Sequence, residues 1–214
     1  MKKIAITQRL ILNEDYYELR EALDVRWGLL FKELGFLPIV LPIEINIKNY
    51  FNEIGIDGIV LTGGNDLYRI NENAISKKRD MFENKIIHYA ISENIPIFGI
   101  CRGMQIIAQY FGAKFTKVYG QVAMRHNIRI NKESKYFKYL NKLKNVNSYH
   151  DYAIESISSS FLVSAVTEYG MIKAIEHKKY KIFAHMWHTE REDPFDDNEM
   201  DMIKYFFNDL EGVI

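Results

Sequence analysis

One short segment constrains the fold of this chain more than any other. Residues 99–103 read Gly-Ile-Cys-Arg-Gly and follow the apolar run 95–98 directly. From residue 103 to residue 111 apolar side chains recur at helical spacing, and Gly112 then provides a stop. A cysteine between two glycines, where a buried strand passes into a helix, is typical of a nucleophile elbow, since glycines permit a sharp turn. The pattern predicts an α/β protein with Cys101 over the end of the sheet.

Cys101 is the only cysteine in the chain. At the N-terminus of a helix, free N–H groups and the helix dipole would favour the thiolate form of its side chain. A lone cysteine is more commonly a small buried apolar residue, but the elbow position favours a nucleophile here.

A cysteine nucleophile needs a base, and the base needs a partner that orients it. His188 follows an apolar segment that resembles one more buried strand, and Glu190 lies two residues later. In an extended chain this spacing puts both side chains on the same side, so the carboxylate can hold the imidazole. Cys101, His188 and Glu190 are therefore predicted to form a catalytic triad. A zinc site with His185 is less favoured, because residues three apart on a strand face opposite sides, and we predict no metal.

The third requirement is a pair of donors for the oxyanion of a tetrahedral intermediate. Residues 57–61 read as a short apolar strand, which Thr62 connects to a turn at Gly63 and Gly64. Adjacent glycines let backbone N–H groups approach a substrate closely. We expect the N–H of Gly64 and the N–H of Arg102 to be the two donors.

Taken together, residues 61–64, 99–105 and 187–190 resemble the class I glutamine amidotransferase superfamily. Within it the chain is most similar to the γ-glutamyl-γ-aminobutyrate hydrolase-like branch, also called peptidase C26, with further matching segments at residues 79–83, 146–150 and 172–176. The resemblance implies a flavodoxin-like fold, no cofactor and the same Cys, His and Glu triad. It also implies that Gln105 and the backbone around Ser148 and Tyr149 hold a γ-glutamyl group, with Gly63, Asn147 and His150 as neighbouring binding residues.

The chain departs from the pattern of that branch at several positions. Met186 and Thr189 replace the usual first and fourth residues of Gln-Trp-His-Pro-Glu, and Asp151 replaces the second of two histidines. The segment after Asp66 is also shorter than usual. These departures concern the pocket for the leaving group and leave the triad intact.

Strand and helix patterns alternate along the chain and predict a mostly parallel central sheet, with helices on both faces and a small antiparallel extension. The expected strands are residues 3–7, 37–41, 57–61, 95–100, 114–118, 127–130, 161–167, 171–176 and 181–185. The expected helices are residues 14–34, 47–54, 76–94, 103–111 and 196–210. We predict a single domain over residues 1–214.

The balance of basic and acidic residues limits the kinds of partner that this protein is expected to bind. There are 28 basic and 28 acidic residues, so no overall field favours nucleic acid or a membrane surface, and we expect neither as a partner. A single cysteine suits a reducing cytoplasm, and no run is long enough to span a membrane. The expected partner is a small γ-glutamyl molecule, with a homodimer left open.

Arg125 and His126 could contact an anionic substrate group or simply lie on the surface, and both interpretations stand.

The favoured function is hydrolysis of the γ-glutamyl amide bond of a small conjugate through a γ-glutamyl thioester, with release of glutamate. The first alternative is a glutaminase that supplies ammonia to a partner synthetase. The second is a catalytically inactive binding protein.

Overall fold

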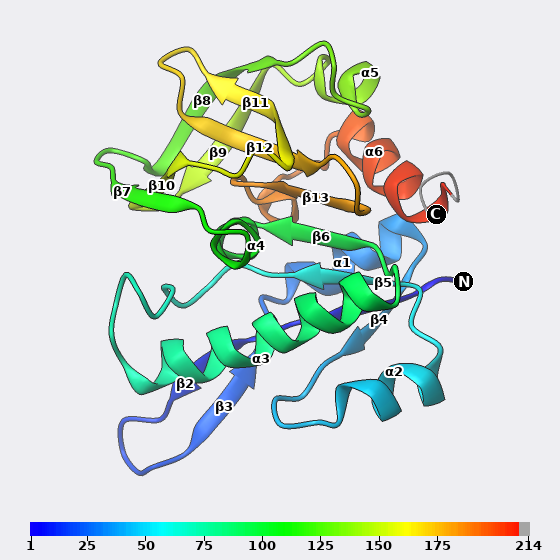
Figure 1. Cartoon of the computed structure of the whole chain (residues 1–214), viewed down its shortest axis with the longest axis vertical. Helices are drawn as coiled ribbons and strands as arrows, with labels where there is room; N and C mark the ends of the chain where they lie inside the picture. Colours follow the sequence, from blue (N-terminus) through cyan, green and yellow to red (C-terminus); the bar gives the residue numbers. More distant parts are fainter. Residues whose placement is uncertain (210–214) are drawn as a thin grey trace.

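A computed structural model describes residues 1–209 and contains one large sheet of nine strands (Figure 1). Five strands run parallel, in the spatial order β4 (Leu37–Val40), β1 (Lys3–Ile6), β5 (Gly58–Leu61), β6 (Ile97–Ile100) and β13 (Ile182–His185). The sheet continues antiparallel through β12 (Ile172–His177), β11 (Phe161–Thr167), β8 (Val122–Ile130) and β9 (Asn145–Tyr149). The predicted α/β class is confirmed, and β13 is the strand at which the direction changes.

Helices cover both faces of this sheet and bury a hydrophobic core under each (Figure 1). On one face lie α1 (Arg26–Leu34) and α6 (Asp197–Asn208), whose apolar residues pack with Phe98 and Phe183. On the other face α2 (Ile47–Ile54), α3 (Ala74–Ser92) and α4 (Arg102–Tyr110) pack with Ile97 and Ile175. Successive residues of a buried strand point to opposite faces, which is why neighbouring apolar residues enter different cores.

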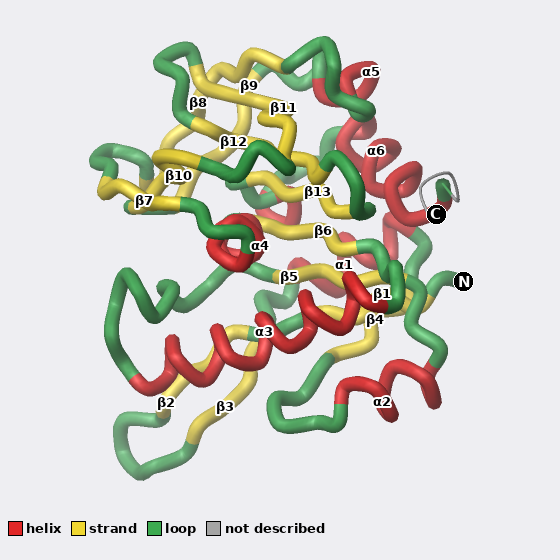
Figure 2. Tube along the Cα trace, viewed as in Figure 1, coloured by secondary structure: helices red, strands yellow, loops and turns green. Residues whose placement is uncertain are grey.

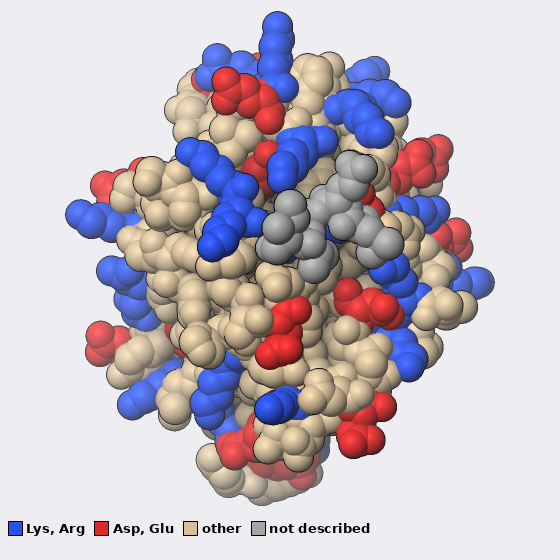
Figure 3. All heavy atoms as spheres, turned by 45° about the vertical axis from the view of Figure 1, so that its right-hand side comes forward, with Lys and Arg blue, Asp and Glu red and all other residues tan. Residues whose placement is uncertain are grey.

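Smaller elements complete the fold (Figure 2). They are the hairpin β2 (Arg9–Leu12) with β3 (Leu19–Ala22), the pair β7 (Lys114–Lys117) with β10 (Tyr152–Ser156), α5 (Phe137–Leu140) and the 3-10 turn η1 (Thr189–Arg191). On the face that Figure 3 shows, basic and acidic side chains are interspersed. No helix within residues 1–209 is both long and apolar enough to cross a membrane.

The predicted helix over residues 14–34 is wrong in its first half. Helix α1 begins only at Arg26, and the residues before it include strand β3. The strand pair is fixed by side chains from elsewhere in the chain. The Asn65 side chain accepts from the Leu10 N–H and donates to the Leu10 carbonyl, at 2.9 and 2.8 Å, as a neighbouring strand would. Glu21 accepts hydrogen bonds from Gln8 and from the N–H of Ile43. Such tertiary contacts override the local helical pattern.

The other predicted elements are close to the observed ones. The helix over residues 47–54 has the predicted bounds, and α3 lies two residues earlier than predicted. Strands β9 and β10 were not expected, and β8 begins at Val122 rather than at Asn127. The predicted end of the last helix, Leu210, lies outside the described residues.

Candidate active site

The strand-to-helix turn between β6 and α4 places Cys101 at the end of the sheet. Cys101 has φ +54° and ψ −106°, a backbone conformation that L residues rarely adopt. Its N–H donates to the carbonyl of His185 at 2.8 Å, and its carbonyl accepts from the N–H of Gln105 at 3.2 Å. The cysteine itself therefore makes the sharp turn, instead of the flanking glycines.

The flanking glycines serve close packing. A Cβ at Gly103 would overlap the carbonyl oxygen of Leu61, and a Cβ at Gly99 would lie 2.7 Å from Cδ1 of Ile107. Neither glycine has a positive φ. They allow α4 to begin directly against strand β5.

His188 reaches the same edge of the sheet from β13, the parallel neighbour of β6. Its Nδ1 lies 2.6 Å from Oε1 of Glu190. Residues 189–191 form a 3-10 turn instead of the expected extended segment, yet the two side chains still meet. Both residues are buried, since His188 is 2 % and Glu190 is 3 % exposed. The structure thus brings Glu190 to the imidazole as the sequence predicted.

The electrostatics of this group favour a thiolate beside an imidazolium. Burial is the largest single effect on each group and opposes its charge, but charge attraction and hydrogen bonds together outweigh it. Next to His188, the pKa of the Cys101 thiol is lowered. Against the effect of burial, Cys101 and Glu190 raise the pKa of His188 to about 9. Because Glu190 holds Nδ1, the buried Nε2 of His188 is the nitrogen left to face the Cys101 thiol.

The turn after β5 lies against both of these side chains. A Cβ at Gly63 would be 2.9 Å from Cε1 of His188 and 3.6 Å from Cβ of Cys101. Gly64 has φ +122°, in the region that favours glycine. The carbonyls of Thr62 and Gly63 each accept from the guanidinium of Arg79 at 2.9 Å. Because N–H and C=O point to opposite sides of a trans peptide, Arg79 turns the N–H groups of Gly63 and Gly64 away from itself.

A buried ionic network continues behind this turn. Glu83 pairs with both Arg79 and Arg102, and Arg102 also pairs with Asp80. All four residues are nearly inaccessible to solvent, at 0 to 5 % exposure. Burial and the neighbouring Arg102 lower the pKa of Arg79 to about 10, and Glu83 opposes this. The network therefore connects the Gly63 turn to the first residue of α4.

Asn147 was expected to bind substrate, but its side chain is directed at the backbone of His188. Its side chain accepts from the N–H of His188 and donates to the carbonyl of His188, both at 2.8 Å. It also donates to Glu192 at 2.7 Å. Asn147 therefore fixes the backbone of the predicted base. Tyr149 lies beside it, with its ring edge-on to His188 at 5.6 Å between centroids.

Lys173, which the sequence analysis missed, lies beside Ser148 and His150. Gln105 donates to the carbonyl of Tyr152 at 3.0 Å. The fully buried ammonium of Lys173 lies 3.1 Å from Oγ of Ser148 and 2.9 Å from Nε2 of His150. Burial lowers the pKa of Lys173 to about 8, opposed by attraction to Cys101. The only signal in the sequence is a lysine within the apolar strand 172–175.

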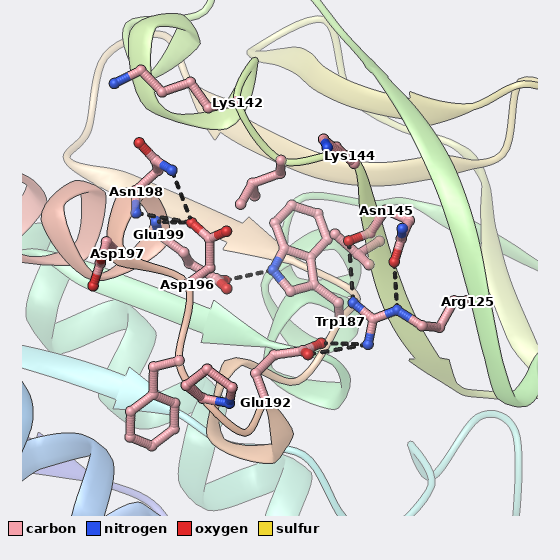
Figure 4. A pocket seen from close by; sticks show the side chains of 14 residues that line it. Arg125, Lys142, Lys144, Asn145, Trp187, Glu192, Asp196, Asp197, Asn198 and Glu199 are labelled. Carbon is pink, nitrogen blue, oxygen red and sulfur yellow. Dashed lines mark hydrogen bonds and ion pairs between the residues drawn. The ribbon is translucent and has the colours of Figure 1, made fainter.

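Arg125 and His126 point to opposite sides of β8. Arg125 pairs with Glu192 at 3.0 Å and lines a cavity of about 440 Å³ beside Trp187 (Figure 4). Asn147 lies between Glu192 and His188. Half-buried His126 instead lies near Lys173, and burial and this charge lower the pKa of His126. The structure therefore places Arg125 in a cavity separate from the predicted triad.

Glu199 supports the segment that carries the base. It accepts from Nε1 of Trp187 at 2.5 Å and from Oγ1 of Thr189 at 2.6 Å. Trp187 stacks on His185, with ring centroids 4.1 Å apart. His185 is fully buried, as expected of a packed histidine, and Thr189 gains a structural role. Within residues 1–209 no cluster of His, Cys, Asp and Glu is arranged to hold a metal ion.

The chain is similar to known proteins along most of its length. The chain is 38 % identical over 208 residues to a γ-glutamyl-CDP-amidate hydrolase of Campylobacter jejuni, covering 96 % of this chain and 97 % of the relative. It is 33 % identical over 184 residues to a glutamine amidotransferase-like protein of Lactococcus lactis, covering 75 % of this chain and 77 % of the relative.

Solved structures share the fold. A GMP synthase subunit from Thermoplasma acidophilum superposes with a TM-score of 0.73 at 23 % identity, covering 97 % of this chain and 92 % of the other. A glutamine amidotransferase of Thermotoga maritima superposes with a TM-score of 0.64 at 15 % identity, covering 95 % of this chain and 82 % of the other. The peptidase C26 family model matches residues 13–190, and the chain belongs to the peptidase C26 family.

Proposed function

We propose that this protein hydrolyses the γ-glutamyl amide bond of a small conjugate and releases glutamate. The observation that carries the proposal is the position of Cys101, on a strained elbow and against the same turn as His188, which Glu190 holds. The name of the Campylobacter jejuni relative makes γ-glutamyl-CDP-amidate the first substrate to test.

The chemistry begins with the thiolate. The Cys101 sulfur attacks the γ-carbonyl carbon, a C–S bond forms, and the carbonyl electrons move to its oxygen. As the oxyanion collapses, the C–N bond breaks and His188 gives its proton to the departing nitrogen. Water, deprotonated by His188, then attacks the thioester and releases glutamate, which returns the sulfur as thiolate. Glu190 keeps the imidazole oriented throughout.

The oxyanion donors in this proposal are the backbone N–H groups of Gly64 and Arg102. The hydrogen bonds from Arg79 to the carbonyls of Thr62 and Gly63 support it, because they fix the orientation of these peptides. Preorganised donors of this kind contribute about 10²–10³ in rate. Gln105 and the backbone around Ser148 and Tyr149 would contact the γ-glutamyl group.

The experiment is glutamate release by the purified protein from γ-glutamyl-CDP-amidate, simpler γ-glutamyl amides and glutamine. We expect turnover without any partner protein and a higher kcat/KM for a conjugate than for glutamine, because contacts to the leaving group can stabilise the transition state. Cys101→Ala should abolish turnover while the protein stays folded. Hydrolysis by a folded Cys101→Ala variant would refute the mechanism.

A glutaminase subunit is the second candidate, because GMP synthases are among the relatives and structural neighbours. Cleavage of glutamine alone, and only after a synthetase is added, would favour that function. A folded wild type that binds γ-glutamyl conjugates without turnover would favour a binding protein.

A further inference from the structure

A small cleft opens beside the predicted base. It has a volume of about 50 Å³ and is lined by His188, Gly63 and Gly64 together with residues of the β2–β3 hairpin, the start of α1 and Arg191. One water needs about 10–15 Å³ of such space, so the cleft has room for a group of a few heavy atoms. Among the residues that line it are two arginines, Arg9 from β2 and Arg191 from η1.

Arg9 brings an uncompensated charge to this cleft. Its Cβ and Nε lie 2.8 and 3.3 Å from where a Cβ of Gly64 would be, so the side chain crosses the glycine turn. The exposed Arg9 guanidinium takes part in no hydrogen bond or ion pair within residues 1–209. Its charge is also close enough to Arg79 to contribute to the lowered pKa of that residue, after burial and Arg102.

Arg191 provides the second cation. Its guanidinium carbon lies 4.4 Å from the centre of the Tyr149 ring, and its Nε is buried without a hydrogen bond from the described part of the chain. The distance from this Nε to Oε1 of Glu190 is 3.7 Å. The side chain is 28 % exposed, so it can reach a ligand in the cleft.

The two carboxylates that line the cleft are already paired. Glu190 is 2.6 Å from Nδ1 of His188 and 3.7 Å from Nε of Arg191, and both oxygens of Asp24 accept from Arg26, with Arg191 close enough to help lower the pKa of Asp24. The cleft therefore has an excess of positive charge. The larger cavity at Trp187 has no such excess, because Glu192, Asp196, Asp197 and Glu199 line it beside Arg125, Lys142 and Lys144.

We propose that this cleft receives the leaving group and that Arg9 and Arg191 select one that carries a phosphoryl group on the scissile nitrogen. The proposal rests on the function proposed above. His188 protonates the leaving nitrogen, so the leaving group must lie on the His188 side of Cys101, which is where the cleft opens. Guanidinium groups match phosphate oxygens in geometry and charge.

The test compares two substrates, γ-glutamyl phosphoramidate and the uncharged γ-glutamyl methylamide, by glutamate release. Arg9→Gln and Arg191→Gln should each lower kcat/KM for the phosphoramidate by about 10- to 100-fold. For the methylamide, Arg9→Gln should change kcat/KM by at most about threefold, since no charged contact is lost there. Arg9→Lys, which keeps the charge, should recover part of the loss. Arg129→Gln, on β8, is the matched control and should affect neither substrate.

Two results would overturn the proposal: equal losses on both substrates, or no loss on either. A separate titration with inorganic phosphoramidate distinguishes this inference from the proposed function. If the wild type cleaves no γ-glutamyl amide, the proposed function is wrong. Saturable phosphoramidate binding that weakens in Arg9→Gln would still support the cleft, and absence of binding would refute it.

Discussion

Replacement of Gly63 by alanine tests how closely the β5 turn controls the predicted base. The new Cβ would lie 2.9 Å from Cε1 of His188, whereas carbon atoms in contact prefer about 3.5–4.0 Å. The imidazole must therefore withdraw by about 0.6–1 Å. It has little freedom to do so, because Glu190 holds its ring and Asn147 holds its backbone. A displacement of about 1 Å at a reacting group can cost about 10²-fold in rate.

We therefore expect Gly63→Ala to lower kcat about 100-fold on any γ-glutamyl amide that the wild type cleaves, with the far-ultraviolet circular dichroism spectrum unchanged. Gly28→Ala is the matched control. Gly28 lies inside α1, and a Cβ there would meet nothing within 4 Å. That variant should keep full activity and gain about 0.5–1 kcal/mol in free energy of unfolding from helix propensity. If folded Gly63→Ala keeps kcat within about threefold of the wild type, our account of this contact is wrong.

The pKa of His188 is raised to about 9 and that of Cys101 is lowered, so kcat/KM should hold through neutral pH and fall as His188 loses its proton near pH 9. A rate that still rises above about pH 10 would contradict this. Glu190→Gln should retain a higher kcat than His188→Ala, because the carboxylate acts only through the imidazole. Equal losses of kcat in the two variants would contradict this role. Arg79→Lys should lower kcat about 10- to 100-fold yet leave alkylation of Cys101 by iodoacetamide nearly unchanged, since alkylation forms no oxyanion. Parallel losses of both rates would instead indicate a general structural role. Burial raises the pKa of Glu199 from 4.5 to about 7, so its favourable contribution to stability is fully present below pH 4.5 and is lost as pH rises through 7. Glu199→Gln should remove this dependence in urea unfolding measured across that range, and an unchanged slope would refute the assignment.

Local patterns predicted the parts of the site that depend on local structure. A strand followed by Gly-Ile-Cys-Arg-Gly and a helix can form few arrangements, so the elbow at Cys101 was predictable. His188 and Glu190 are only two residues apart and follow a buried strand. Their side chains are therefore close enough to meet even in a 3-10 turn. The catalytic roles of these three residues stay predictions.

Long-range contacts could not be predicted in this way. The β2–β3 hairpin is fixed by hydrogen bonds between Leu10 and Asn65, which are 55 residues apart. The prediction of a helix over residues 14–34 did not reveal these contacts. Lys173 was missed for a related reason, because its partners Ser148 and His150 come from a separate segment. The same hairpin carries Arg9 to the site, so the wrong helix also concealed the proposed leaving-group cleft.

The place of β13 in the sheet has a consequence for the order in which the molecule can assemble during synthesis. This central strand is formed by residues 182–185, yet it pairs on one side with β6, at residues 97–100, and on the other with β12. While the ribosome makes the intervening residues, β6 has one unpaired edge, which is open to pairing with other chains. The insertion of β13 closes that edge and brings His188 to Cys101 in the same event. A nascent chain therefore cannot bring His188 next to Cys101 until this strand has been inserted.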